Sequence, residues 1–116
     1  MKWTIFVVSA LLPLTASAEF ITCSDVYVER VSVQGDRDES HYFENKMILR
    51  LKGPSGEAML CGNKEYITLS NTHPAYNGML SIALTAFTTN KKISVSVNSS
   101  VGSSLSNQLS AITITE

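Results

Sequence analysis

Apolar and polar residues alternate with a period of two through most of the chain, which is the pattern of half-buried β-strands. The clearest case places Met47, Leu49 and Leu51 on one face of a strand and polar residues on much of the other. Extended segments are predicted at residues 25–33, 46–52, 93–97 and 109–115, and residues 57–61 and 65–69 form one further extended section that is interrupted at Cys61-Gly62-Asn63. The chain is therefore expected to be mainly β.

The first of these segments changes phase in its middle. Val26 and Val28 share one face, whereas Val31 and Val33 share the opposite face, and the change falls at Glu29-Arg30. A shift of one residue inside a β pattern indicates a bulge or a sharp coil in a long strand. Two short strands with an irregular joint are the alternative.

One segment follows the helical period instead. Its apolar residues recur at spacings of three and four, as expected for one face of a helix, and they are Tyr76, Met79, Leu80, Ala83, Leu84 and Phe87. Helix-capping residue types and Pro74 precede this segment, and Asn90 followed by Lys91 and Lys92 is a typical helix end. We expect a single buried helix that ends at Asn90.

The resulting order, β-β-β-α-β-β, is that of an OB-fold, a small five-stranded barrel. In this arrangement the helix would close one end of the barrel with Tyr76, Leu80, Leu84 and Phe87. The alternative fold is an open α+β sheet with the helix packed across one face.

The first 18 residues have the features of a secretory signal peptide. A positive charge at Lys2 is followed by an apolar run of about ten residues, too short to span a bilayer, and by Ala16-Ser17-Ala18. Signal peptidase recognises small residues spaced in this way. We expect cleavage near Ala18, a single OB-like domain over residues 19–116, and a secreted or periplasmic location; a buried N-terminal strand or helix is the alternative.

Charge limits the classes of partner. The formal net charge is −1, and it would be −2 without Lys2. Nucleic acids and anionic membranes require a basic surface, so we expect neither as a partner. Because no other apolar run approaches membrane-spanning length, we expect that the mature chain is not embedded in a membrane.

Two cysteines, Cys23 and Cys61, remain after the predicted signal peptide. An even number of cysteines in a small exported chain is typical of a disulfide. A metal site and two free thiols are the alternatives, but the chain has only two histidines to complete a set of metal ligands.

Motifs for catalysis are missing from the sequence. It has no G-x-S-x-G element and no phosphate-binding glycine loop. The acidic run around Asp36 and Asp38 lacks the spacing of a calcium-binding EF-hand loop. We therefore expect a protein that is not an enzyme and has no cofactor and no metal.

Two polar segments are expected to form loops. Residues 98–108 are rich in Ser, Asn and Gly and include the glycosylation sequon Asn98-Ser99-Ser100. Residues 34–45 are charged and rich in turn-forming types, and OB-folds often bind ligands through the loop between their first two strands. The candidate binding residues are therefore Asp36, Arg37, Asp38, His41 and Tyr42, unless these are ordinary surface residues.

The layout resembles the B subunits of bacterial AB5-type toxins, particularly those of the subtilase-cytotoxin type. The likeness is carried by the signal peptide, a cysteine near the mature N-terminus, and the passage SIALTAFTTNKKISVSV from helix to strand. It implies a ring-forming module that binds a cell-surface glycan or receptor, with a homo-oligomer as the assembly. The alternative is a structural, assembly or accessory (inhibitor-like) secreted protein that acts on a secreted partner protein.

Overall fold

The computed structural model describes residues 19–37 and 40–115, and it is mainly β with one helix, as predicted. The elements in chain order are β1 (Phe20–Gln34), β2 (Lys46–Lys52), β3 (Ala58–Met59), β4 (Tyr66–Ser70), α1 (Tyr76–Thr89), β5 (Ile93–Gly102) and β6 (Ser106–Ile114). The predicted signal peptide and Asp38 lie outside the described residues.

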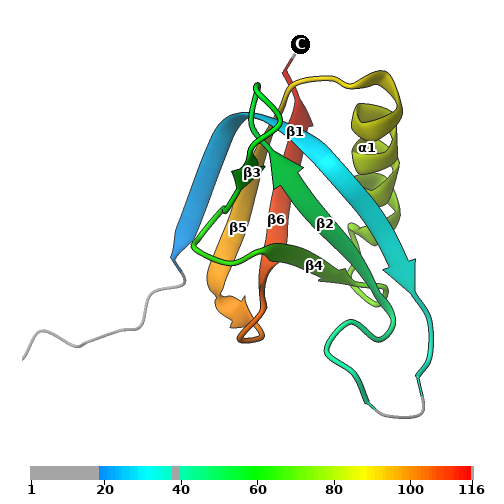
Figure 1. The fold of residues 1–116 in the computed structure, drawn as a ribbon. Coiled ribbons are helices and arrows are strands. Elements are labelled where there is room, and N and C mark those ends of the chain that lie inside the picture. The colour runs from blue at the N-terminus through cyan, green and yellow to red at the C-terminus, as the bar shows by residue number, and fades with distance from the viewer. Residues whose placement is uncertain (1–18, 38–39, 116) are drawn as a thin grey trace, which may run out of the picture.

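The strands close into a ring (Figure 1). They follow the order β1-β5-β6-β4-β2, and β2 pairs again with β1, while the short β3 extends the edge of β2. All neighbours are antiparallel except β4 and β6, which run parallel. This closure means that the alternative of an open sheet does not apply.

Strand β1 takes part in two pairings because it bends. Its first residues pair with β5 and its later residues with β2. The predicted change of phase is confirmed as a register shift between Val28 and Arg30. A second irregularity, between Cys23 and Val26, was not predicted; there Asp25 adopts a left-handed φ of 57°, which Asp tolerates better than most residues.

Inward-facing side chains of the ring form the core. The central members are fully buried, namely Met47, Leu49, Leu51, Ile67, Leu69, Val95, Val97 and Leu109. Alternation along each strand therefore places apolar residues inside and leaves the outer face of β2 and β4 largely to polar side chains.

Helix α1 contacts β1 and β6 (Figure 1), and the predicted apolar stripe faces the core only in part: Tyr76, Met79, Leu80 and Ala83 pack there. Its fully buried residues are Ala83 and Ala86, whose small side chains allow the helix to approach the strands closely. Leu84 and Phe87 were expected in the core, yet they are 45% and 47% exposed. That part of the prediction is wrong. The buried face includes Ala86, and an alanine is a weak indicator of a buried helix face because its side chain is small.

The ends of the helix differ in how well the sequence predicted them. Asn90 adopts the left-handed conformation and ends the helix, as expected. The start lies at Ala75, which makes no side-chain capping bond. In place of a cap, the His73 ring accepts a hydrogen bond from the Ala75 amide at 3.1 Å and orders the turn before the helix.

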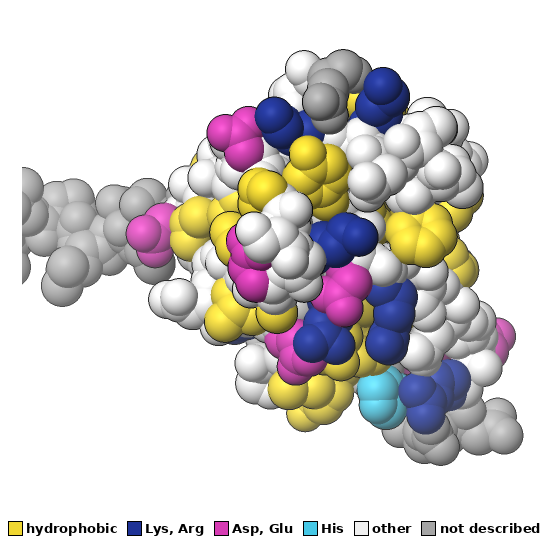
Figure 2. Space-filling view, turned by 45° about the horizontal axis from the view of Figure 1, so that its top comes forward, with side chains coloured by type: hydrophobic (Ala, Val, Ile, Leu, Met, Phe, Trp, Pro, Cys, Tyr) yellow, Lys and Arg dark blue, Asp and Glu magenta, His cyan; other side chains and the backbone are white. Residues whose placement is uncertain are grey.

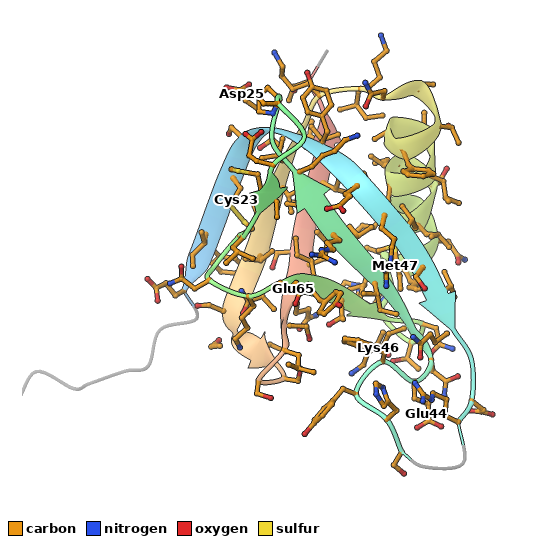
Figure 3. All side chains as sticks on the ribbon, viewed as in Figure 1. Cys23, Asp25, Glu44, Lys46, Met47 and Glu65 are labelled. Carbon is orange, nitrogen blue, oxygen red and sulfur yellow. A yellow bond between two sulfur atoms is a disulfide. The ribbon has the colours of Figure 1, made fainter. Side chains whose placement is uncertain are left out.

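A disulfide joins Cys23 in β1 to Cys61 in the connection between β3 and β4 (Figure 3). The Cα atoms are 6.0 Å apart, and no free cysteine remains. The predicted pairing is confirmed, and the metal and free-thiol alternatives are excluded. Among the described residues, no helix is long and apolar enough to cross a membrane.

The expected loop at residues 98–108 is instead mostly a hairpin. Strand β5 continues to Gly102, β6 begins at Ser106, and Asn98 pairs with Gln108. Gly102 has a φ of 137°, and an added Cβ would collide with the backbone of Ser106, so the turn requires glycine here. The polar composition was misleading because this hairpin has few buried apolar side chains beyond Val97.

Candidate functional site

The loop between β1 and β2 is shaped by its own polar side chains. The Arg37 amide donates to Glu44 Oε1 at 2.9 Å, and its guanidinium donates to Gln34 Oε1 at 3.0 Å. The Asn45 side chain donates to Asp36 Oδ1 at 2.7 Å. Asp36 and Arg37, two of the candidate binding residues, thus make hydrogen bonds that hold the loop.

The other two described candidates, His41 and Tyr42, belong to an aromatic cluster. The His41 ring lies edge-on to Phe43 at 5.4 Å between centroids, and Phe43 lies edge-on to Tyr66 at 5.2 Å. His41 Nδ1 also accepts a hydrogen bond from the Phe43 amide. Tyr42 stands at the outer end of this cluster and is 55% exposed, so its ring is accessible to a ligand.

Arg50 of β2 connects the aromatic cluster to the outer face of the β-sheet. The Arg50 guanidinium lies 5.9 Å from the centre of the Tyr66 ring and 2.9 Å from the Glu65 carboxylate. Glu29 Oε2 of β1 lies 3.8 Å from Arg50 Nε. Contacts of this kind to an aromatic ring and two carboxylates hold the guanidinium in one orientation and support the Tyr66 ring.

A pocket of about 230 Å³, here the hairpin pocket, opens beside this loop. It is lined by Lys46, Thr68, Ser70, Val101, Gly102 and Gln108, which come from β2, β4, the β5–β6 hairpin and β6. Lys46 Nζ donates to the Tyr42 carbonyl at 2.8 Å, so one side chain links the pocket to the aromatic cluster (Figure 3 labels Lys46).

Thr68, which lines the hairpin pocket, belongs to a chain of hydroxyl groups. Thr68 Oγ1 lies 3.2 Å from Ser106 Oγ, which lies 3.1 Å from Ser103 Oγ. Hydroxyls can reverse the direction of their hydrogen bonds. The lining hydroxyls of Thr68 and Ser70 can therefore both donate and accept, next to one cation and the apolar side chain of Val101.

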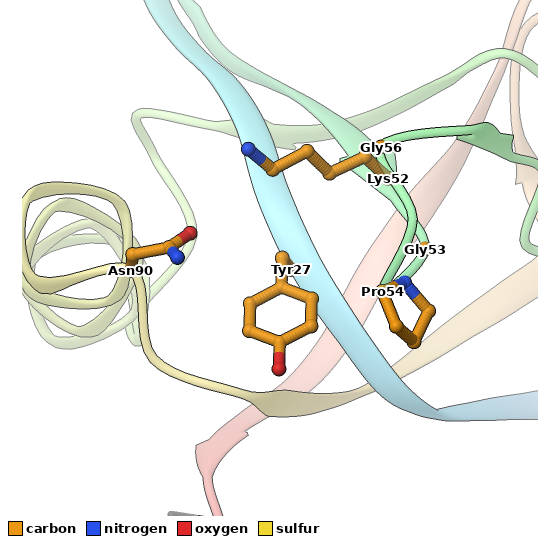
Figure 4. A pocket seen from close by; sticks show the side chains of 6 residues that line it. All are labelled: Tyr27, Lys52, Gly53, Pro54, Gly56 and Asn90. Carbon is orange, nitrogen blue, oxygen red and sulfur yellow. The ribbon is translucent and has the colours of Figure 1, made fainter.

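A second pocket of about 320 Å³, here the turn pocket, lies at the other end of β2 (Figure 4). It is lined by Tyr27, Lys52, Gly53, Pro54, Gly56 and Asn90. These residues come from β1, the end of β2, the turn after β2, and the residue that ends α1. The turn pocket combines two apolar rings, Tyr27 and Pro54, with an ammonium group and an amide.

Sequence reasoning identified the loop but missed both pockets. Lys46, Thr68 and Gln108 are polar positions on strands, and a polar outer face is ordinary for a strand. What makes them neighbours is the pairing of β2 with β4 and the parallel pairing of β4 with β6, which connect distant parts of the chain. The alternating pattern of β2 was enough to predict that Lys46 and Lys52 share its outer face, but it could not predict the pockets around them.

Across residues 19–37 and 40–115, no three His, Cys, Asp or Glu side chains form a group that could hold a metal ion. No protein-family model matches the chain, and no curated protein matches it either.

Proposed function

We propose that the protein is an exported, non-enzymatic binding module that recognises a glycan through the hairpin pocket and the neighbouring loop. The observation that carries this proposal is a pocket of hydroxyl, amide and amine groups whose lysine, Lys46, donates to the backbone carbonyl of Tyr42, a residue with an exposed ring. Sugars combine hydroxyl groups with flat faces of C–H bonds, so they suit a site that pairs polar groups with an aromatic ring.

The position of the pocket supports the same proposal. In OB-fold proteins the face of the second and third strands, together with two flanking loops, binds oligosaccharides and oligonucleotides. Here the corresponding strands are β2 and β4, and they lie between the loop before β2 and the β5–β6 hairpin. This is an argument from fold, and the chemistry of the lining residues is what favours a glycan.

The signal-peptide pattern of residues 1–18 supports export to a periplasm or to the exterior. The Cys23–Cys61 disulfide suits an oxidising compartment of this kind. In such a place the partner would be a cell-surface glycan or a glycosylated receptor. The resemblance to AB5-type B subunits supports this class of ligand and a homo-oligomeric ring.

An accessory or assembly role is the second candidate, and exposed apolar side chains favour it. Leu84 and Phe87 lie about one turn apart on α1, and both are nearly half exposed. A secreted partner protein or a second copy could cover them. Light scattering separates the cases, because a closed ring fits the toxin-like module, whereas a monomer without glycan affinity fits the accessory role.

Replacing the exposed ring of Tyr42 tests the glycan site. A glycan array first selects the best ligand, and calorimetry then compares the wild type with Tyr42→Ala. We expect the substitution to weaken binding about tenfold, roughly 1.4 kcal/mol, because Tyr is among the residue types whose truncation at a binding surface most often costs more than 1 kcal/mol.

The matched control is Phe20→Ala, which removes an aromatic side chain that is 65% exposed at the start of β1. This control should bind the glycan like the wild type. Equal losses in the two variants, or no glycan bound by the wild type, would contradict the proposed site.

A further inference from the structure

We infer that the ligand is an acidic, linear glycan that lies along the outer face of β1 and β2, from the hairpin pocket to the turn pocket. This inference rests on the proposed glycan-binding function and adds to it the charge of the ligand, its minimum length and a second contact region. It is carried by the distribution of basic side chains on these two strands.

Four basic residues share this outer face. Met47, Leu49 and Leu51 are fully buried, so the alternate positions of β2 must face outward. On β1, Arg30 is the register partner of Arg50 and is exposed. Together these positions form the basic row, which consists of Arg30, Lys46, Arg50 and Lys52.

Most of the basic row lacks an acidic partner. Arg50 is held by Glu65 and Glu29. Within the described part of the chain, Arg30, Lys46 and Lys52 form no ion pair with a carboxylate. Figure 2 shows Lys and Arg side chains spread across the middle of the molecule, with acidic groups among them.

This clustering contrasts with the chain as a whole, whose formal net charge is −1. Cations gathered on one face create a local positive potential, even when the net charge of a protein is slightly negative. The face of β1 and β2 is therefore suited to an anionic ligand, which the overall composition does not indicate.

The turn pocket adds unused polar groups at the end of the row. Tyr27 and Lys52 are register partners, so their side chains lie side by side on the outer face. Among the described residues, the Tyr27 hydroxyl, the Lys52 ammonium and the Asn90 side-chain amide have no hydrogen-bond partner.

The nearest acidic side chain in the turn belongs to Glu57, and it is occupied. The Ser55 amide donates to Glu57 Oε2 at 2.9 Å, and the other carboxylate oxygen is packed against Gly53. No Asp or Glu lines the turn pocket. The pocket therefore offers an ammonium, a hydroxyl and an amide to a carboxylate, and the rings of Tyr27 and Pro54 to the sugar that carries it.

The distance between the two pockets sets the length of the ligand. Lys46 and Lys52 stand at opposite ends of β2, and six steps along a strand cover about 20 Å. This span exceeds one sugar ring, so a ligand that reaches both pockets must contain several units.

The density of charge favours a glycan over a nucleic acid. The unpaired cations of the basic row are spread over about 20 Å of strand, whereas a nucleic acid strand carries a phosphate about every 3.4 Å. A uronic-acid glycan combines isolated carboxylates with many hydroxyls, and hydroxyl and amide groups line both pockets.

Calorimetry with oligogalacturonate and its fully methyl-esterified form tests the inference, because the two ligands differ in charge and in the ester methyl groups. We expect the acid form to bind more tightly and its affinity to fall as salt is added. Lys52→Gln and Arg30→Gln should each weaken binding of the acid form about two- to fivefold, the range for a partly exposed ion pair. Binding of the methyl ester should be unaffected by either substitution.

The control Ser81→Glu changes the net charge by the same amount on the exposed side of α1, and it should bind the acid form like the wild type. Thermal unfolding of each variant checks that the fold is intact; Arg30 is exposed, so Arg30→Gln should fold even if Lys52→Gln does not.

Two results would overturn the inference while leaving the glycan proposal in place. One is equal affinity for oligogalacturonate and its methyl ester, and the other is wild-type affinity for the acid form in both Lys52→Gln and Arg30→Gln. Binding of neither ligand nor any glycan on an array would overturn both. Tighter binding to single-stranded oligo(dT) than to oligogalacturonate would also overturn it and would identify a nucleic acid as the ligand of this face.

Discussion

Loss of the Cys23–Cys61 disulfide should lower the free energy of unfolding by about 2–5 kcal/mol, a large share of the 5–15 kcal/mol typical of native proteins. The cysteines are separated by 38 positions in the sequence. Without the bridge, the unfolded chain regains the conformational freedom of this long loop. In the chain-entropy account, most of the loss arises in this way.

The position of the bridge gives a second reason for a large effect. The first residues of β1 pair with β5, and it is the later residues of the strand that pair with β2. Cys61 is 2% exposed and belongs to the core, so the disulfide ties the start of β1 to the connection between β3 and β4. Reduction would leave this part of β1 held mainly by its pairing with β5.

The experiment compares the wild type and the Cys23→Ala, Cys61→Ala double variant, each with and without reductant. Denaturant titration of the wild type should show the loss of stability on reduction. The double variant should be similarly destabilised and insensitive to reductant. An unchanged midpoint for the reduced wild type, with both thiols confirmed free by titration, would show that the bridge contributes little.

Local patterns in the sequence were sufficient for most of the fold. Alternation located the strands, the phase change at Glu29-Arg30 located one of the two irregularities in β1, and Asn90 located the end of the helix. Each of these features is set by residues within a few positions of one another. Such local preferences act in the same direction as the global fold in natural proteins.

The errors came from packing and from pairings between distant segments. Leu84 and Phe87 follow the helical period, but the residues of the helix that are fully buried are Ala83 and Ala86. Periodicity alone does not show how closely a helix approaches the strands against which it packs. The candidate site was found only in part for a similar reason. Its loop is continuous in sequence, whereas the hairpin pocket needs the parallel pairing of β4 with β6.

Asn107 is a residue that no local pattern would single out, since it is a polar side chain on a strand. It is 0% exposed, and its side-chain nitrogen donates to the carbonyls of Cys61 and Gly62, both at 3.1 Å. Its Oδ1 atom is buried and has no hydrogen-bond partner in the described structure. The amide therefore holds the backbone beside the disulfide from inside the core.

Gly62 completes this arrangement. It has a φ of 74°, and a Cβ at this position would collide with the Asn107 amide nitrogen. The close approach of backbone and amide leaves little room for rearrangement. A new side chain at position 107 therefore cannot move away from the backbone carbonyls that Asn107 contacts.

Asn107→Asp keeps the shape of the side chain and replaces its donor with a carboxylate oxygen. At neutral pH this places a buried negative charge against two carbonyl oxygens. We expect the free energy of unfolding to fall by about 3 kcal/mol or more, because an unpaired buried charge is among the costliest changes in a core. Gln108→Glu, the same chemical change at the half-buried neighbouring residue, should cost much less.

The pH dependence distinguishes charge from altered packing. Burial raises the pKa of the new carboxyl in the folded state above its unfolded value of about 3.9. Between these two values the folded state binds more protons, so the stability of Asn107→Asp relative to the wild type should fall as pH rises, and most of the loss should disappear below about pH 4. A loss of equal size at pH 3.5 and pH 7, measured by denaturant titration, would show that the charge is not its cause.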